Sequence, residues 1–287
     1  MYYLLTENFK SNEAKLVTLI EKATPVEKIY LLCSTLATHR TESIFLTDAP
    51  SNRNVSHYWL LVLINKNCGH SETYVQDKIE NNCRHFIPVT AIVFDIAKFN
   101  GFLVQGHRFA CTVLKIAVLL SDNSNMPLAT PRPIIYDHSK EEASLSQALN
   151  KVNEFLAGAE LYCLRKQTKM AAFMLHQAAE HSLNAILKKG TGLHVNTHNI
   201  DKLIRYCSMI NYKLRSIFPA DGEENKKLIA LLQKSYIDTR YNEDFTVSNL
   251  ELITMTERVK LLQQMANGYM KDKEYEEVKN EISSNNI

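Results

Sequence analysis

The sequence predicts an α+β protein in which a small mixed α/β domain precedes an all-α helical bundle. Six of the seven prolines lie at or before Pro133, and more than eighty residues separate it from Pro219. Short strand-like apolar runs alternate with helical segments in the first half, whereas apolar residues of the second half recur at helical spacing. We therefore expect domains at residues 1–135 and 140–272, followed by a flexible polar tail at 273–287.

Apolar, β-branched and aromatic runs predict three buried strands in the first half. They are Lys28–Cys33, His57–Ile64 and Val89–Ile96. Residues Ser11–Lys22 and Thr73–Cys83 have the spacing of amphipathic helices. Two segments allow further elements: Glu42–Thr47 fits a hairpin strand, and Phe109–Leu120 fits an apolar helix or a helix followed by a strand.

The second half predicts four or five helices packed as a bundle. Helical spacing covers Gln147–Lys189, where Gly190 and Gly192 provide a stop, and resumes over His198–Tyr212. Two pairs with the spacing of a capping box mark the start of later helices. These pairs are Asp221 with Glu224, and Ser248 with Glu251.

Local patterns of the second half occur in the order typical of one known domain. They are Phe155–Tyr162, Met170–Glu180, the turn Thr197–Ile200, and Asp238–Tyr241. With these patterns the second half resembles the HEPN domain, a small helical bundle, over roughly residues 150–268. The resemblance implies that two copies pair, so we expect a homodimer formed through the helical bundle.

The first half is similar to a minimal nucleotidyltransferase domain, which often accompanies HEPN domains. Ser56–Val62 corresponds to the strand that carries two metal-binding aspartates in that family, and Val89–Ala91 falls at the third. In this comparison His57, Trp59 and Thr90 stand where the aspartates would lie. Mg²⁺ needs hard oxygen ligands, usually carboxylates. We therefore expect no nucleotidyl transfer, no metal site and no cofactor.

The resemblance also concerns cleavage of RNA. HEPN ribonucleases carry an arginine followed four to six residues later by a histidine, and Arg240 matches this arginine without any such histidine after it. We therefore expect no catalysis by the usual mechanism of the family. The alternative is a ribonuclease with an atypical histidine, for which His198 is the candidate general acid or base. At a turn before a helix, His198 can instead have a capping or packing role.

Local charge favours binding over catalysis. From Cys163 to Arg215 there are nine Lys or Arg and two acids, whereas the whole chain has a formal charge of +2. A focused positive surface attracts the phosphates of RNA or of a free nucleotide. The predicted contact residues are Arg165, Lys169, Gln177, Glu180, His198, Asp238, Arg240 and Tyr241.

Within this set, Arg240 is suited to pair with a phosphate and Tyr241 to stack on a base. Other interpretations remain open: the cations can form a solvated face, and Arg240 can form a buried ion pair with Asp238 or Glu180. Gln177 and Glu180 can line a site or belong to a polar network between helices.

Features of the whole chain favour a protein of the cytoplasm. No apolar run approaches the ~18 residues of a membrane span, and the first ten residues have no leader pattern. The scattered cysteines indicate reduced thiols. Besides RNA or a nucleotide, a partner protein held by the N-terminal sheet is a third possibility, in which both domains serve as an interaction scaffold.

Overall fold

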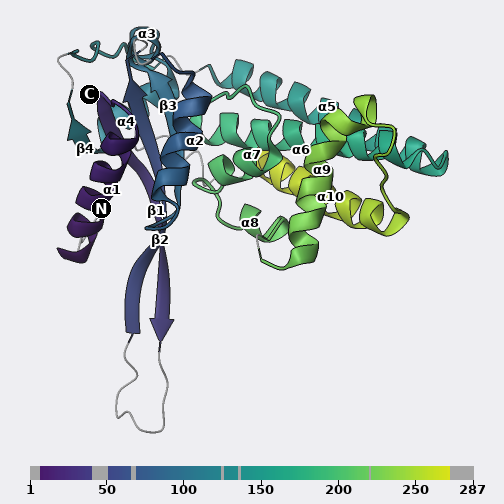
Figure 1. The fold of residues 1–287 in the computed structure, drawn as a ribbon. Coiled ribbons are helices and arrows are strands. Elements are labelled where there is room, and N and C mark those ends of the chain that lie inside the picture. Colours follow the sequence, from purple (N-terminus) through teal and green to yellow (C-terminus); the bar gives the residue numbers. More distant parts are fainter. Residues whose placement is uncertain are drawn as a thin grey trace, which may run out of the picture. The chain divides into compact units, whose positions relative to one another are not determined.

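The computed structural model describes residues 7–40, 51–65, 69–123, 126–134, 137–219 and 221–271. The chain forms two compact units, residues 1–135 and 136–287. The first holds a four-stranded mixed sheet with helices, and the second is helical (Figure 1). This confirms the predicted α+β class. The strand expected at Glu42–Thr47 and the tail at 273–287 lie outside the described residues.

The sheet of the first unit has the strand order β3-β2-β1-β4. Its strands are β1 (Lys28–Arg40), β2 (Ser51–Ile64), β3 (Val89–Asp95) and β4 (Val118–Asp122). Strand β1 is antiparallel to both β2 and β4, whereas β2 and β3 are parallel. Because β1 and β2 are much longer than their neighbours, their ends form a two-stranded ribbon beyond the sheet (Figure 1). All three predicted strands are confirmed.

Among the described residues of the first unit, four helices accompany this sheet. They are α1 (Glu7–Ala23), α2 (Glu72–Cys83), α3 (Ile96–Val104) and α4 (Arg108–Ile116). The segment that allowed two interpretations forms a helix and then a strand, α4 and β4. Helix α3 was not predicted, although Ile96, Phe99 and Leu103 are buried at helical spacing. Its first turn is capped by Asp95, whose Oδ1 accepts hydrogen bonds from the backbone N–H groups of residues 97 and 98.

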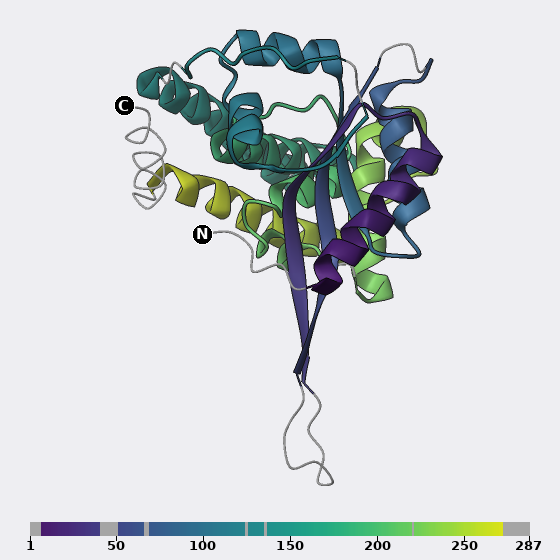
Figure 2. The same cartoon turned by 90° about the vertical axis from the view of Figure 1, so that its left-hand side faces the viewer.

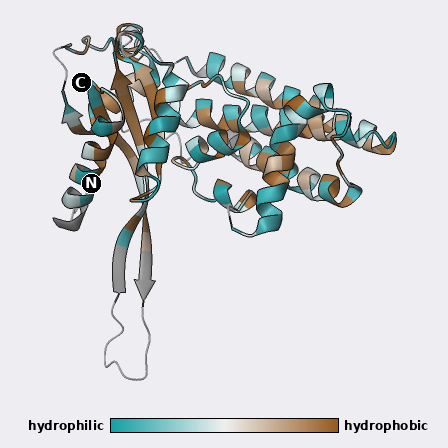
Figure 3. Cartoon of the chain, viewed as in Figure 1, coloured by the Kyte–Doolittle hydropathy of each residue, from teal (hydrophilic) through white to brown (hydrophobic). Residues whose placement is uncertain are grey.

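Both faces of the central strand β2 are buried. Helices α1 and α2 lie on the same side of the sheet (Figure 2), where Leu16 and Ile79 join a core with Leu60 and Val62. The alternate residues Trp59, Leu61 and Leu63 point to the other face and are also buried. Burial on both faces explains why β2 is a continuous apolar run rather than an alternating one. Figure 3 shows the hydrophobic colouring of these strands.

The second unit is built around helix α6. Its elements are α5 (His138–Leu164), α6 (Thr168–Thr191), α7 (Ile200–Cys207), α8 (Leu214–Ile217), α9 (Glu223–Tyr241) and α10 (Asn249–Lys271). Helix α6 packs against α5, α7, α9 and α10. Many of its buried positions are alanine, which lets neighbouring helices approach closely.

The helix ends confirm some expectations and correct one. Gly192 caps α6 in the left-handed conformation, with φ 80°, a region that favours glycine. Ser248 and Glu251 form the expected capping box, since Glu251 N–H donates to Ser248 Oγ at 3.3 Å and Ser248 N–H donates to Glu251 Oε2 at 2.9 Å. The capping box expected at Asp221 is wrong. Gly222 is the residue that precedes α9, and it offers no side chain for a cap.

Candidate functional site

Side chains from α6, α9 and the connection between α6 and α7 meet in the second unit. Helix α6 supplies His176 and Glu180, one turn apart, and α9 supplies Tyr236 and Arg240, also one turn apart. His198 comes from the connection that precedes α7. We call these five residues the α6–α9 cluster.

The first pair in this cluster joins Glu180 to His198. The Glu180 oxygens lie 3.1 and 3.0 Å from His198 Nδ1. The Glu180 side chain is largely buried, whereas half of the His198 side chain is exposed. Because a carboxylate oxygen accepts hydrogen bonds, Nδ1 of His198 is the donor in this contact and Nε2 is on the other edge of the ring. Within the described residues no hydrogen bond reaches Nε2, so it is available to a ligand.

His176 lies beneath this pair and is fully buried. Its Nε2 donates to the carbonyl oxygen of His198 at 3.1 Å, and Gln177 Nε2 donates to its Nδ1 at 3.3 Å. The pKa of His176 is lowered to about 4, chiefly because burial disfavours the charged ring, with a smaller contribution in the same direction from the positive charge of Arg240. Near pH 7 the ring is therefore neutral, and its 3.8 Å approach to Glu180 is not an ion pair.

Arg240 is exposed and surrounded by aromatic rings. Its guanidinium carbon lies 4.6 Å from the ring centroid of Tyr236, 5.4 Å from that of Tyr241 and 5.7 Å from that of Phe173. Its Nε and Nη2 donate to the carbonyl oxygen of Tyr236 at 3.0 and 2.7 Å. No carboxylate pairs with Arg240 in the described part of the chain. The interpretation of Arg240 as a buried ion-pair residue is therefore wrong.

Tyr236 connects the two halves of the cluster. The His198 ring stacks on it at 4.3 Å between centroids with an interplanar angle of 22°, and Arg240 contacts the same ring. Gln233, one turn earlier on α9, donates to the His198 carbonyl at 3.1 Å and accepts from the Ile200 N–H at 2.7 Å. Tyr236 was not among the predicted residues, although its position four residues before Arg240 places both on one helix face.

The remaining predicted residues lie in different surroundings. Lys169 Nζ donates to the Glu243 carbonyl oxygen at 2.5 Å, near the end of α9. Tyr241 is 77% exposed beside Arg240. Asp238 is two residues from Arg240, which places it on another side of α9. Arg165 is exposed in the turn before α6, and in the described part of the chain its side chain makes no hydrogen bond or ion pair.

The structure thus groups Gln177, Glu180, His198, Arg240 and Tyr241, and leaves Arg165 and Asp238 outside. The cations counted together in the sequence include residues that lie far apart. Lys169 and Lys188 lie near opposite ends of α6, about 28 Å apart along its axis. Cations counted together in the sequence are therefore spread along a long helix, and a single positive surface stays a prediction.

In the first unit, the residues compared with catalytic aspartates are neighbours. Trp59 on β2 is paired with Thr90 on β3. His57 Nε2 is hydrogen bonded to Thr90 Oγ1 at 2.8 Å, and the rings of His57 and Trp59 lie 4.3 Å apart. All three side chains are buried. No group of three His, Cys, Asp or Glu suited to a metal ion is found within the described residues.

Comparison with known proteins finds a family model that matches most of the second unit. The family model of the HEPN domain matches residues 145–269, from inside α5 to inside α10. This confirms the resemblance proposed for the second half. No curated protein matches the sequence. Among the described helices, none combines the length and apolar character needed to cross a membrane.

Proposed function

We propose that this chain is a non-catalytic, dimeric module that binds RNA or a nucleotide through the α6–α9 cluster. The observation that carries the proposal is the exposed guanidinium of Arg240, which rests among three aromatic rings without a carboxylate partner. Two of its nitrogens are engaged by the Tyr236 carbonyl. The remaining N–H groups are free to donate to a phosphate, in a side chain whose position is already set.

The neighbouring tyrosine supplies the second element of the proposed contact. Tyr241 is mostly exposed and lies against Arg240. An exposed aromatic ring beside a phosphate-binding cation is the usual means of holding single-stranded nucleic acid without base specificity. Arg240 also lies in the last turn of α9, where a cation favours the helix terminus. A binding experiment distinguishes this structural role from the proposed one.

The test measures fluorescence anisotropy of a labelled single-stranded RNA titrated with the full chain. We expect Arg240→Gln to weaken binding at least about fivefold, because one charge-assisted contact is lost. The matched control is Arg215→Gln, which removes an arginine that lies 5.7 Å from another tyrosine ring, that of Tyr212. Absence of binding by the unaltered chain, or equal losses in the two variants, would overturn the proposal.

Dimer formation is proposed through helix α10. Leu250, Ile253 and Leu261 are exposed and fall within one side of this helix. Exposed apolar side chains aligned in this way mark interaction surfaces. Sedimentation velocity should find a dimer that Ile253→Lys converts to a monomer. Leu164→Lys, at an exposed leucine near the end of α5, should leave the dimer intact.

A ribonuclease is the second candidate, and the Glu180–His198 pair favours it. A carboxylate that orients the Nδ1 side of a histidine leaves Nε2 suited to proton transfer. Arg240, which contacts the same Tyr236 ring, is suited to stabilise a charged phosphorane. Incubation of the chain with end-labelled RNA tests this. Cleavage that is lost in His198→Ala would support the ribonuclease and contradict the non-catalytic proposal. RNA that stays intact would support the non-catalytic proposal.

For the first unit we propose a nucleotidyltransferase-like scaffold without its metal ligands. The adjacency of His57, Trp59 and Thr90 on two neighbouring strands supports the comparison made from the sequence. The three side chains fill this position with an imidazole, an indole and a hydroxyl group. None of them supplies the carboxylates that metal-dependent phosphoryl transfer requires.

A further inference from the structure

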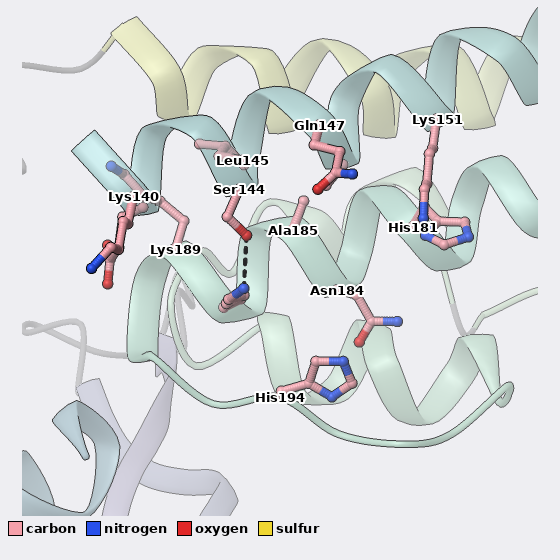
Figure 4. Close-up of a pocket in the computed structure, with 13 residues that line it drawn as sticks. Lys140, Ser144, Leu145, Gln147, Lys151, His181, Asn184, Ala185, Lys189 and His194 are labelled. Atoms are coloured by element: carbon pink, nitrogen blue, oxygen red, sulfur yellow. Dashed lines mark hydrogen bonds between the residues drawn. The ribbon is translucent and has the colours of Figure 1, made fainter. Parts of the chain in front are cut away.

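A pocket of about 460 Å³ lies between α5 and α6 in the second unit (Figure 4). Its volume is typical of concave binding sites and leaves room for a few side chains. Leu145, Ala148 and Ala185 form the apolar part of its lining. Around them stand mostly basic and polar residues of α5 and α6, and none of the lining residues belongs to the α6–α9 cluster.

The lining of this pocket is positively charged. Its described residues include four lysines and one acid, Glu141, which give a formal charge of +3 with neutral histidines. The lysines come from both helices and are Lys140, Lys151, Lys188 and Lys189. Lys140 also pairs with Asp137 at 3.0 Å, so its charge is partly balanced. Lys188 Nζ donates to Ser144 Oγ at 2.8 Å across the two helices, as Figure 4 shows. Several cations around one concave space attract an anionic segment.

The sequence that follows α10 has the opposite charge. Residues 272–287 lie outside the described residues and contain five acids and two lysines, a formal charge of −3. Glu277 and Glu281 are four residues apart, and so are Val278 and Ile282. On a helical turn this spacing places two acids together beside two apolar side chains. The segment therefore complements both the charge and the apolar part of the pocket lining.

The direction of α10 brings this segment toward the pocket. Helix α10 packs against α5 in the antiparallel direction, since Lys260 Nζ lies 2.8 Å from Glu160 Oε1 and Gln263 Nε2 donates to Asn153 Oδ1 at 2.6 Å. The last turn of α10 thus lies toward the beginning of α5, the part that lines the pocket, and Figures 1 and 2 show these two helix ends on the same side of the second unit. Residues 272–276 can span up to about 17 Å when extended, more than the ~10–12 Å width of a helix.

We propose that residues 276–282 dock in this pocket of their own chain. Glu277 and Glu281 pair with lysines of both helices, and Val278 and Ile282 cover the apolar part of the lining. The polar tail expected from the sequence is then flexible only when it leaves the pocket. Docking makes the pocket self-occupied, so that any other acidic segment has to displace the tail.

The first test compares NMR spectra of the full chain and of two double variants. Glu277→Gln/Glu281→Gln should shift the ring signals of His194, which lines the pocket, because the docked segment leaves it. The matched control, Glu223→Gln/Glu224→Gln, removes the same charge from the first turn of α9, whose residues do not line the pocket. This control should leave the signals of His194 unchanged.

The second test locates the segment by carbodiimide coupling, which joins a carboxylate to an amine in contact with it. In the unaltered chain, Glu277 and Glu281 should couple to Lys151 or Lys188. They should not couple to Lys226 of α9, which does not line the pocket. A mixture of unlabelled and ¹⁵N-labelled chains should yield couplings within one chain, because the docked segment belongs to the chain that provides the pocket.

Signals of His194 that are the same in the unaltered chain and in the tail variant would overturn the proposal. Couplings to Lys226 as frequent as those to the pocket lysines would also overturn it, as would couplings found only between a labelled and an unlabelled chain. Neither measurement involves Arg240, so the proposal for RNA binding is tested independently.

Discussion

The carboxylate of Glu180 lies 3.0 Å from Nδ1 of His198, whose ring in turn stacks on Tyr236. The same histidine accepts two hydrogen bonds at its carbonyl oxygen, from His176 and Gln233. The connection between α6 and α7 is thereby attached to α6 and to α9 through one residue. This attachment sets the orientation of the exposed imidazole beside the ring that Arg240 contacts.

Replacing Glu180 should separate hydrogen bonding from charge. Glu180→Ala removes the acceptor for His198 Nδ1, and we expect a loss of about 1–2 kcal/mol in the free energy of unfolding, reduced by the solvent exposure of His198. Glu180→Gln keeps an acceptor oxygen and should lose less. Urea unfolding followed by far-UV circular dichroism measures both. Equal losses would mean that the charge of Glu180, rather than its hydrogen bond, holds His198.

His176 should remain neutral in mildly acidic solution. Its ordinary pKa of 6.5 applies to the unfolded chain, and burial lowers it to about 4 in the folded chain. Between these pH values the unfolded state binds more protons, so stability present above pH 6.5 is lost as pH falls toward 4, by on the order of 3 kcal/mol. NMR titration of the ring carbons measures this directly. A midpoint near 6.5 for His176, equal to that of an exposed histidine, would disprove the predicted burial.

The capping box at the start of α10 should contribute measurably to the stability of the helical unit. Ser248→Ala removes the Oγ that accepts from the Glu251 N–H and donates to its carboxylate. We expect a loss of about 1 kcal/mol. Thr254→Ala, which deletes a hydroxyl bonded only to the carbonyl of residue 250 within the same helix, is the control. Equal effects of the two changes in urea unfolding would show that the cap adds nothing.

Trp59 offers a direct probe of the proposed scaffold without metal ligands. It is the only tryptophan of the chain and is fully buried beside His57. Its emission should therefore be that of an apolar environment and should not respond to Mg²⁺ with a nucleoside triphosphate, because no carboxylate stands at these positions. A saturable change in Trp59 emission that requires Mg²⁺ would contradict the proposal for the first unit.

The fold was largely predictable because its strands and helices have clear local patterns. The buried strand β2 is marked by its continuous apolar run, and Ser248 with Glu251 marks the start of α10. The capping box predicted at Asp221 was wrong, because the spacing of two residues does not reveal which residue has the backbone conformation of a helix cap. Helix α3 follows β3 directly at Asp95, so its apolar residues merged with the strand in the sequence pattern.

The residues of the candidate site were predictable only where they belong to a recognised sequence motif. Arg240 and Tyr241 belong to the resemblance, whereas Tyr236 and His176 acquire their roles through contacts between helices. Charge counted along the chain also failed to represent charge in space. The window from Cys163 to Arg215 combined lysines from opposite ends of α6.

The most direct test of RNA binding at the α6–α9 cluster is photo-crosslinking to single-stranded RNA that contains 4-thiouridine, with mass spectrometry to locate the attached residue. The stacking role of Tyr241 predicts a crosslink on this residue that is strongly reduced in Arg240→Gln, while Arg215→Gln crosslinks as the unaltered chain does. Crosslinks confined to other segments, with Tyr241 unmodified, would contradict this site.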